Sequence, residues 1–217
     1  MQEKNISKSV IRRLPRYNRF LGELIREGKE KISSRELSER MRLTASQIRQ
    51  DLNCFGGFGQ QGYGYNVAEL RAEISAILKI NGEPRKVILF GAGNLGRAIA
   101  AHINFEKYGF KLIGIFDRDS SAIGEVIAGI TVESIENLRS FCKANSPEMA
   151  ILCIPPESAK VVVSELITDC GINTFWNYSH YDILGDFPEA VVENVHLSDS
   201  LMILSYEMAA KSTDTEA

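Results

Sequence analysis

A glycine-rich segment in the middle of the chain most constrains its fold. Residues 86–90 form a short apolar run typical of a strand, and residues 97–102 continue in a helical pattern. Between them, Gly91, Gly93 and Gly96 have the G-x-G-x-x-G spacing of the turn that joins strand to helix in nucleotide-binding folds. The segment predicts a Rossmann-type parallel α/β sheet whose first turn binds a pyrophosphate. A glycine turn without a ligand is the alternative.

An acidic residue stands where such a fold recognises ribose. Residues 112–116 form a second strand run, and Asp117 follows Gly96 by 21 positions. A carboxylate at this strand end accepts bonds from both ribose hydroxyls and repels a 2′-phosphate, which favours NAD over NADP. The pyrophosphate should lie on the amides of residues 93–96, at the positive end of the helix. The expected NAD(H)-binding residues are Gly91, Ala92, Gly93, Asn94, Leu95, Gly96, Asp117 and Pro155.

The rest of the second half continues the alternation of strand and helix. Residues 149–154 and 173–177 predict further strands, with a helix at 159–170 between them. Pro155 ends the first of these strands, at the edge where a cofactor passes. Residues 197–209 predict a last amphipathic helix, which docks either on a partner subunit or on its own domain. Its expected apolar side consists of Leu197, Leu201, Leu204 and Met208.

The first eighty residues differ from the rest in charge. They carry 15 Lys and Arg against 9 Asp and Glu, a net of +6, whereas residues 81–217 carry 10 against 19, a net of −9. Together these give the net charge of −3. The split favours a polyanion-binding module joined to something else, although an unevenly charged solvated surface is equally compatible. The turn residues 81–84 predict the boundary between the two halves.

The basic half begins with an amphipathic helical pattern over residues 9–27. Pro15 is expected to bend this helix or delay its start, and Gly28 to end it. The expected inward-facing residues are Val10, Leu14, Tyr17, Leu21 and Leu24.

Two short helices joined by a tight turn then predict a helix-turn-helix. Ser33 with Glu36 forms a capping box at the start of the first helix, and Thr44 with Gln47 forms another at the start of the second. The expected inward-facing residues of this pair are Leu37, Met41, Ile48, Leu52 and Phe55.

The second of these helices has the chemistry to read base edges. Gln bonds bidentately to adenine and Arg to guanine, although an ordinary polar helix face is the alternative. The glycine-rich stretch that follows predicts a hairpin, or wing, with Gln60 and Gln61 at its tip, in preference to a flexible loop. Residues 67–78 predict another helix. The expected DNA-binding residues are Arg13, Ser46, Gln47, Arg49, Gln50, Gln60 and Gln61.

Several classes of protein are disfavoured. The chain has no apolar run long enough to span a bilayer, and residues 1–13 contain no apolar core of a signal peptide. The cysteines Cys54, Cys142, Cys153 and Cys170 are widely spaced, which argues against a metal site or a disulfide framework and fits a reducing cytoplasm.

The sequence offers no recognisable catalytic constellation. His102, His180 and His196 stand apart from other catalytic residue types, and little chain remains for a substrate domain. We therefore expect a regulator and no catalytic residues. A small NAD-dependent oxidoreductase with a basic appendage stays open, as does a regulator that binds another adenine nucleotide or coenzyme A on the same fold.

Seven motifs run in order along nearly the whole chain: Arg13-Leu14-Pro15, Ser33-Ser34-x-Glu36-Leu37, Gln47-Ile48-Arg49-x-Asp51-Leu52, Phe55-Gly56-x-Phe58-Gly59, Gly62-x-Gly64-Tyr65-x-Val67, Gly91-x-Gly93-Asn94-Leu95-Gly96 and Phe116-Asp117-x-Asp119. Together they resemble those of the Rex redox-sensing transcriptional repressors. The resemblance implies a homodimer that binds double-stranded operator DNA through winged-helix domains, here residues 1–80. It implies Rossmann domains that hold NAD(H), here residues 84–195, and a C-terminal helix, within residues 196–217, exchanged between subunits. In the family, NADH favours release from DNA and NAD+ permits binding.

The chain departs from the family at the positions that transmit cofactor binding from one domain to the other. The family links its two domains through an arginine, a tyrosine and an aspartate, and the matching positions here are Arg19, Ile103 and His196. A charge-assisted bond from Arg19 to a carboxylate at position 196 is therefore impossible. The family's Asn-Phe-Ala-Pro segment reads Asn-Tyr-Ser-His at residues 177–180. The wing tip carries glutamines in place of basic residues, so DNA binding should be weaker or less dependent on salt.

Overall fold

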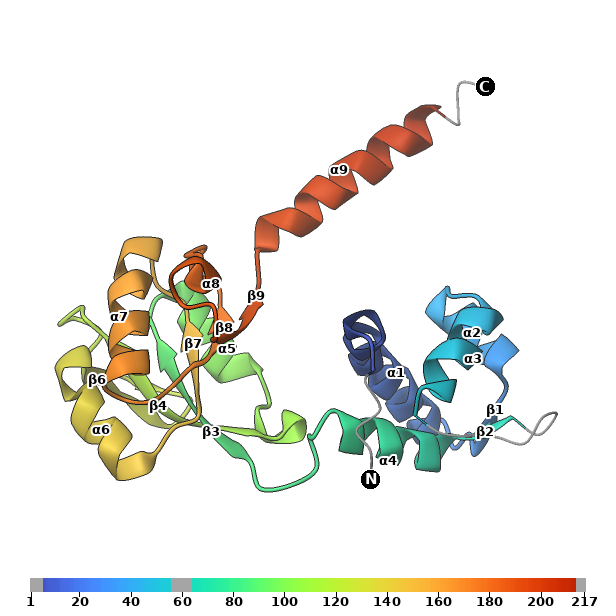
Figure 1. The fold of residues 1–217 in the computed structure, drawn as a ribbon, viewed down its shortest axis with the longest axis horizontal. Helices are drawn as coiled ribbons and strands as arrows, with labels where there is room; N and C mark the ends of the chain where they lie inside the picture. The colour runs from blue at the N-terminus through green and yellow to red at the C-terminus, as the bar shows by residue number, and fades with distance from the viewer. Residues whose placement is uncertain (1–5, 56–63, 214–217) are drawn as a thin grey trace. The chain divides into compact units, whose positions relative to one another are not determined.

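The structure is a computed structural model that describes residues 6–55 and 64–213. The chain divides into two compact units, Met1–Gly82 and Glu83–Ala217 (Figure 1). Within the described ranges, every helix is too short or too polar to cross a membrane.

The N-terminal unit packs helices around one apolar core. Helix α1 (Lys8–Arg26) lies against α4 (Val67–Ile77), and α2 (Ser34–Met41) pairs with α3 (Ala45–Asn53). The short strand β1 (Lys31–Ile32) pairs antiparallel with β2 (Tyr65–Asn66). The expected inward-facing residues of α1, α2 and α3 are buried, except that Phe55 is only partly covered. The predicted wing tip lies outside the described residues.

Helix α1 begins seven residues before Pro15, so the proline does not delay its start. Ser7 caps the helix by accepting a bond from the amide of Val10, and Pro15 is exposed. Burial of an apolar stripe from Val10 onward outweighs the cost of about 3 kcal/mol that proline imposes inside a helix. Gly28, with φ of +74°, follows the C-cap as expected.

The helix-turn-helix has one complete capping box. Ser33 and Glu36 exchange both hydrogen bonds at the start of α2. At the start of α3, Thr44 accepts the bond from the amide of Gln47, but the Gln47 side chain bonds Asp51 instead of returning to the N-cap. The second predicted capping box is therefore only half formed, because a buried carboxylate offers this amide a charged partner.

Asp51 is the polar centre of the N-terminal core. Its side chain is 1% exposed, and it accepts two bonds of 2.7 Å from Arg13, one of 3.0 Å from Tyr17 and one of 2.8 Å from Gln47. Burial alone raises the pKa of Asp51, but the bonds from Arg13, Gln47 and Tyr17 outweigh burial and leave that pKa below its usual value. Since Arg13 and Tyr17 belong to α1, the carboxylate fixes α3 against α1.

The C-terminal unit is a seven-stranded sheet in the order β5-β6-β4-β3-β7-β8-β9, as described in residues 83–213. The strands are β3 (Arg85–Phe90), β4 (Phe110–Asp117), β5 (Val126–Ile127), β6 (Ile130–Ser134), β7 (Met149–Leu152), β8 (Thr174–Asn177) and β9 (Val191–Asn194). The strand pairs are parallel except β5 with β6, which are antiparallel. The chain moves outward from β3 to β6 and then returns to β7, so the order reverses between β3 and β7. This confirms the predicted parallel α/β fold.

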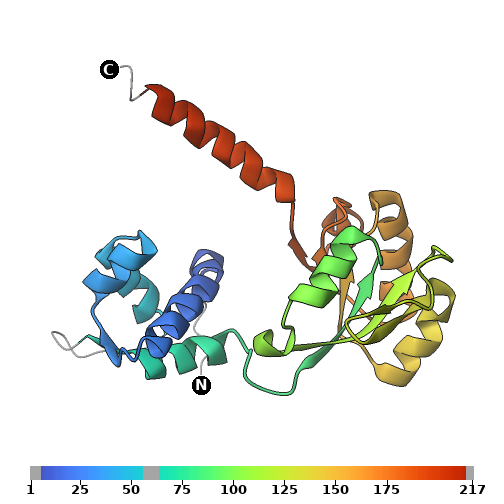
Figure 2. The same cartoon turned by 180° about the vertical axis from the view of Figure 1, so that it is seen from behind.

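Helices cover both faces of the sheet (Figures 1 and 2). Val87 and Leu89 of β3 share one cluster with α5 (Asn94–His102), and Ile88 and Phe90 share the other with α6 (Leu138–Asn145) and α7 (Pro156–Thr168). The alternation of strand side chains places these pairs on opposite faces. Short helical turns lie at η1 (Glu106–Tyr108), η2 (Ile135–Asn137) and α8 (Ile183–Asp186).

Helix α9 (Leu197–Thr213) follows β9 and exposes apolar side chains on more than one side, with serines and charged residues between them. The predicted apolar side is exposed: Leu197, Leu201, Leu204 and Met208. Met202, Ile203 and Tyr206, on the other sides, are at least 61% exposed. The helix is therefore less one-sided than the sequence predicts, and within the described residues its apolar side chains stay exposed instead of docking on their own domain. Large apolar side chains exposed along a whole helix are unfavourable in water and favour burial against a partner.

We expect Asp51→Asn to destabilise the folded N-terminal unit by about 3 kcal/mol, because Arg13 loses its buried partner. A lowered folded-state pKa means that Asp51 stabilises the fold above its unfolded pKa of about 4 and ceases to do so as pH falls through the folded value. Urea unfolding of the wild type should therefore show an acid-side loss of stability that is smaller in Asp51→Asn.

The control for this substitution is Glu27→Gln. It removes an ion pair with Arg40 that is equally well aligned but exposed to solvent. Solvent screens exposed pairs, so this variant should unfold close to wild type. Equal effects of the two substitutions would contradict a central role for Asp51.

Candidate functional site

Gly91 and Gly96 let three backbone segments meet at the carboxyl end of β3. Gly91 has φ of +98°, and a Cβ built on it would overlap the carbonyl oxygen of Cys153, which follows β7. A Cβ on Gly96, in the first turn of α5, would overlap the carbonyl oxygen of Gly91. A side chain at either position would push β3 away from β7 or α5, so both glycines serve packing.

Gly93 differs from these two because its missing side chain leaves open space. Among the described residues, no atom lies within 4 Å of a Cβ built there, and its φ of −72° suits any residue. Gly93 is the N-cap of α5, so in the described structure no N-cap side chain bonds the first amides of the helix. The first amides of α5 and the positive end of its dipole therefore face a position where a phosphate can bind.

Asp117, the last residue of β4, anchors this turn. Its Oδ2 accepts a 2.6 Å bond from the amide of Ala92, and its Oδ1 accepts bonds of 2.6 Å and 3.0 Å from the amides of Arg118 and Asp119. The sequence predicted a ribose acceptor and did not predict this internal role. A carboxylate has about four lone-pair sites, so these three bonds leave capacity for a ribose hydroxyl.

A small cavity of about 100 Å³ lies beside Asp117 at the carboxyl edge of the sheet. It joins the ends of β3 and β4 to the start of α7, where Pro155 is the N-cap. The structure thus places the predicted residues Asp117 and Pro155 together. The cavity is lined by Phe90, Phe116, Asp117, Arg118, Ile135, Ile154, Pro155, Ser158 and Val162.

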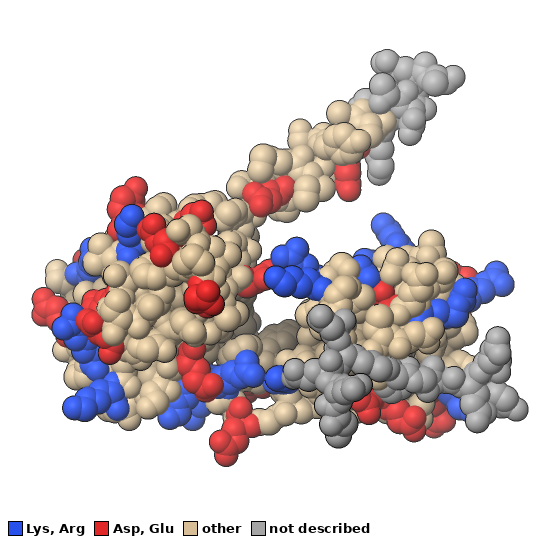
Figure 3. Space-filling view, in the orientation of Figure 1, with Lys and Arg blue, Asp and Glu red and all other residues tan. Residues whose placement is uncertain are grey.

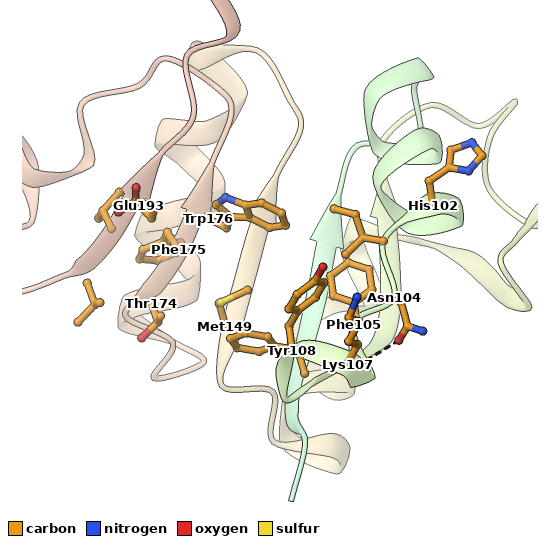
Figure 4. A pocket seen from close by; sticks show the side chains of 14 residues that line it. His102, Asn104, Phe105, Lys107, Tyr108, Met149, Thr174, Phe175, Trp176 and Glu193 are labelled. Atoms are coloured by element: carbon orange, nitrogen blue, oxygen red, sulfur yellow. Dashed lines mark hydrogen bonds between the residues drawn. The ribbon is translucent and has the colours of Figure 1, made fainter. Parts of the chain in front are cut away.

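A second, larger cavity of about 760 Å³ is an apolar groove that the sequence did not predict (Figure 4). One wall comes from the end of α5 and from η1, and the other from β8 and β9. In Figure 4, Trp176 and Tyr108 approach each other across the groove, with Met149 between the walls. Ile103, expected to pass on the bound state, contributes to the lining. A concave site of this volume with an apolar lining is typical of a binding site.

Arg19 and His196, the other two residues expected to transmit cofactor binding, lie on different units. Arg19 is exposed on α1, with its guanidinium carbon 5.8 Å from the Phe20 ring centroid. His196 lies between β9 and α9, where its ring stacks on that of His180 with centroids 4.5 Å apart. His196 therefore has an aromatic partner within its own unit.

The residues predicted to bind DNA divide into two sets. Ser46, Arg49 and Gln50 are exposed on α3, and Arg49 donates a 3.2 Å bond to Ser34. The side chains of Arg13 and Gln47 instead bond Asp51, so neither projects freely from the surface. Lys and Arg side chains stand out over the helices of this unit in Figure 3. Gln60 and Gln61 lie outside the described residues.

Sequence reasoning missed Asp51, although one signal was available. Asp51 lies three positions after Ile48 and next to Leu52, on the side of α3 predicted to face inward. An acidic residue at such a position requires buried hydrogen-bond donors. Two of the donors, Arg13 and Tyr17, belong to α1, which is distant in sequence but packs nearby. Among residues 6–55 and 64–213, no three His, Cys, Asp or Glu are grouped to hold a metal ion.

The two units define a class of protein, in which a helix-turn-helix is joined to a nucleotide-binding α/β fold. Two family models match the chain: "Putative DNA-binding protein N-terminus" over residues 5–53 and "CoA binding domain" over residues 82–181. Both matches fall on the corresponding units of the structure.

Whole-chain comparisons identify the family. The redox-sensing transcriptional repressor Rex of Clostridium botulinum (strain Alaska E43 / Type E3) is 48% identical over 95% of this chain and 97% of its own. That of Clostridium perfringens (strain SM101 / Type A) is 49% identical over 94% and 95%. The solved structure of RSP, a Rex-family repressor, shares 44% identity over 97% of both chains with a TM-score of 0.86. The chain belongs to the Rex family of redox-sensing transcriptional repressors, as its motifs predicted.

We expect Gly96→Ala and Gly93→Ala to differ sharply in stability. Alanine at position 96 must displace the Gly91 carbonyl, whereas alanine at position 93 meets open space. Thermal unfolding should show a Tm several degrees below wild type for Gly96→Ala and a near-wild-type Tm for Gly93→Ala. A large loss of stability in Gly93→Ala would contradict the open position.

Proposed function

We propose that this protein is a dimeric repressor that binds operator DNA and leaves it when NADH replaces NAD+. Relatives support this: RSP has been solved in complex with β-NAD+ and operator DNA, and in complex with β-NADH. These two structures share 47% and 42% identity with this chain, each with a TM-score of 0.86. The observation that carries the proposal is the open phosphate position at Gly93, in the same chain as a helix-turn-helix.

The dinucleotide would lie along the carboxyl edge of the sheet, in the domain of residues 84–195. Its pyrophosphate would meet the amides of residues 93–96, and its adenosine half would enter the cavity between Asp117 and Pro155. Asp117 would accept a ribose hydroxyl while it holds the Ala92 amide. The other half of the dinucleotide would cross the switch point, the place between β3 and β7 where the strand order reverses.

Operator DNA would bind to the domain of residues 1–80. Ser46, Arg49 and Gln50 would meet base edges or phosphates from the exposed side of α3, Arg49 with the donors that its bond to Ser34 leaves available. Gln47 and Arg13 would act chiefly by fixing α3 through Asp51, with their remaining donors available to phosphate. Gln60 and Gln61 are proposed at the wing.

Two copies would join through α9, within residues 196–217. The helix exposes a set of apolar side chains, and the same unit carries an apolar groove at Trp176 and Tyr108. Exchange of α9 would bury both surfaces at once. Such a dimer presents two recognition helices to a palindromic operator.

Release by NADH requires that the cofactor bind the DNA-free arrangement more tightly than the DNA-bound one, because equal affinity shifts nothing. The protein would act as a regulator in the cytoplasm, without catalysis and without a resident metal. Domain movement would transmit the difference from the sheet unit to the recognition helices.

We expect operator affinity to fall at least tenfold as the NADH/NAD+ ratio rises at constant total cofactor, measured by fluorescence anisotropy on full-length protein. Gly93→Ala is the matched variant, since its added methyl group occupies the pyrophosphate position without disturbing the fold. It should bind the operator like wild type and fail to respond to NADH. A wild-type protein whose operator affinity ignores the ratio would overturn the proposed redox response.

A second ligand class follows from the match to the CoA binding domain. Coenzyme A also carries an adenosine and a pyrophosphate, which suit the same turn. In a thermal-shift assay at equal ligand concentration, NADH should raise the Tm more than coenzyme A does. The reverse order would favour a coenzyme A-responsive regulator.

A further inference from the structure

The loop that follows β8 lies next to the cofactor turn. The amide of Tyr178 donates a 3.0 Å bond to the carbonyl of Leu152, the last residue of β7. Burial, together with the neighbouring Cys153, raises the pKa of Tyr178 to about 12. The carbonyl of Cys153 in turn abuts Gly91. The loop of residues 177–180 therefore lies on the sheet edge where the second half of a dinucleotide extends past the switch point.

Asn177 ties this loop to β9 through a saturated buried amide. Its Nδ2 donates to the carbonyl of Tyr181 at 2.9 Å and to Oδ1 of Asn194, the last residue of β9, at 2.8 Å. Its Oδ1 accepts from the amide of Ser179 at 3.0 Å and from the Ser179 hydroxyl at 2.5 Å. The side chain is fully buried, and these four bonds use its whole capacity. Loop and strand therefore move together.

His180 makes a second link, to the residue that precedes α9. Its ring stacks on that of His196 at an interplanar angle of 28°. His180 has φ of +61°, a left-handed conformation that is unfavourable for a residue with a side chain. Contacts with the surroundings stabilise such a conformation, and the ring stack is one contact that His180 makes. Nδ1 of His196 lies 3.8 Å from Oδ2 of Asp199 in the first turn of α9.

We propose that His180 and His196 are positioning residues that couple the cofactor edge to the start of α9. The inference rests on the proposed function, because it assigns a route by which NADH reaches the helix that joins two subunits. Asn177 holds the loop, and the stacked rings transmit its displacement past β9.

The test uses full-length protein and two single variants. His180→Asn removes the ring while keeping a residue that tolerates left-handed backbone, and His196→Ala removes the other ring. Each should reduce the NADH-induced loss of operator affinity about fivefold or more, while NADH affinity and Tm stay near wild type. The double variant should be no worse than either single variant, because both remove the same contact.

Two further variants separate coupling from general disruption. His196→Phe keeps an aromatic ring for the stack and should restore most of the response. Tyr181→Phe removes only the nearby hydroxyl bond to Asp186 and should respond like wild type.

The possible failures are distinguishable. A wild type that ignores NADH would overturn the proposed function together with this inference. A responsive wild type with equally responsive His180→Asn and His196→Ala would overturn the coupling role alone. So would a His196→Phe variant that behaves like His196→Ala, since the ring would then be irrelevant.

Discussion

The close approach of three backbone segments at Gly91 sets the geometry of the sheet unit. Its backbone lies against the carbonyl of Cys153, its own carbonyl lies against Gly96, and Asp117 holds the next amide. These contacts fix β3, β4, β7 and α5 relative to one another. Gly91 and Gly96 are needed for packing, whereas Gly93 faces open space at the first turn of α5, where an anion can bind. The loop after β8 reaches the same edge through Cys153.

A buried carboxylate plays the corresponding part in the DNA-binding unit. Asp51 gathers donors from α1 and from its own helix, so the exposed residues of α3 stand on a rigid support. Buried polar networks specify one arrangement when every member is satisfied, and described residues leave no buried side-chain nitrogen or oxygen without a partner. Each unit thus positions one helix through a close contact. In the sheet unit the start of α5 packs on the Gly91 carbonyl, and in the N-terminal unit the inner face of α3 is bonded through Asp51.

Helix α9 is the element through which we propose that two copies assemble. Its apolar surface and the apolar groove at Trp176 are each unfavourable in water, and one exchange between two copies would cover both. The residue that precedes α9 stacks on the loop beside the cofactor edge. In the proposed dimer, the ligand would be read through the element that joins the two copies, so ligand response and dimer geometry would be linked.

The sequence by itself determined the local features: the glycine turn, the buried periodicities of α1 to α3, and the family, which the ordered motifs identified. The turn and the periodicities depend on residue spacing and backbone conformation over a few neighbouring residues. Only the tertiary structure decided that Arg13 and Gln47 bond Asp51, that Asp117 holds the turn, and that His196 stacks on His180. Their partners lie up to 38 residues away, and a hydrogen bond over that separation depends on how elements pack, which periodicity does not encode. Only the structure shows that the apolar stripe of α9 stays exposed on its own unit, because burial depends on packing between elements and not on the pattern within the helix.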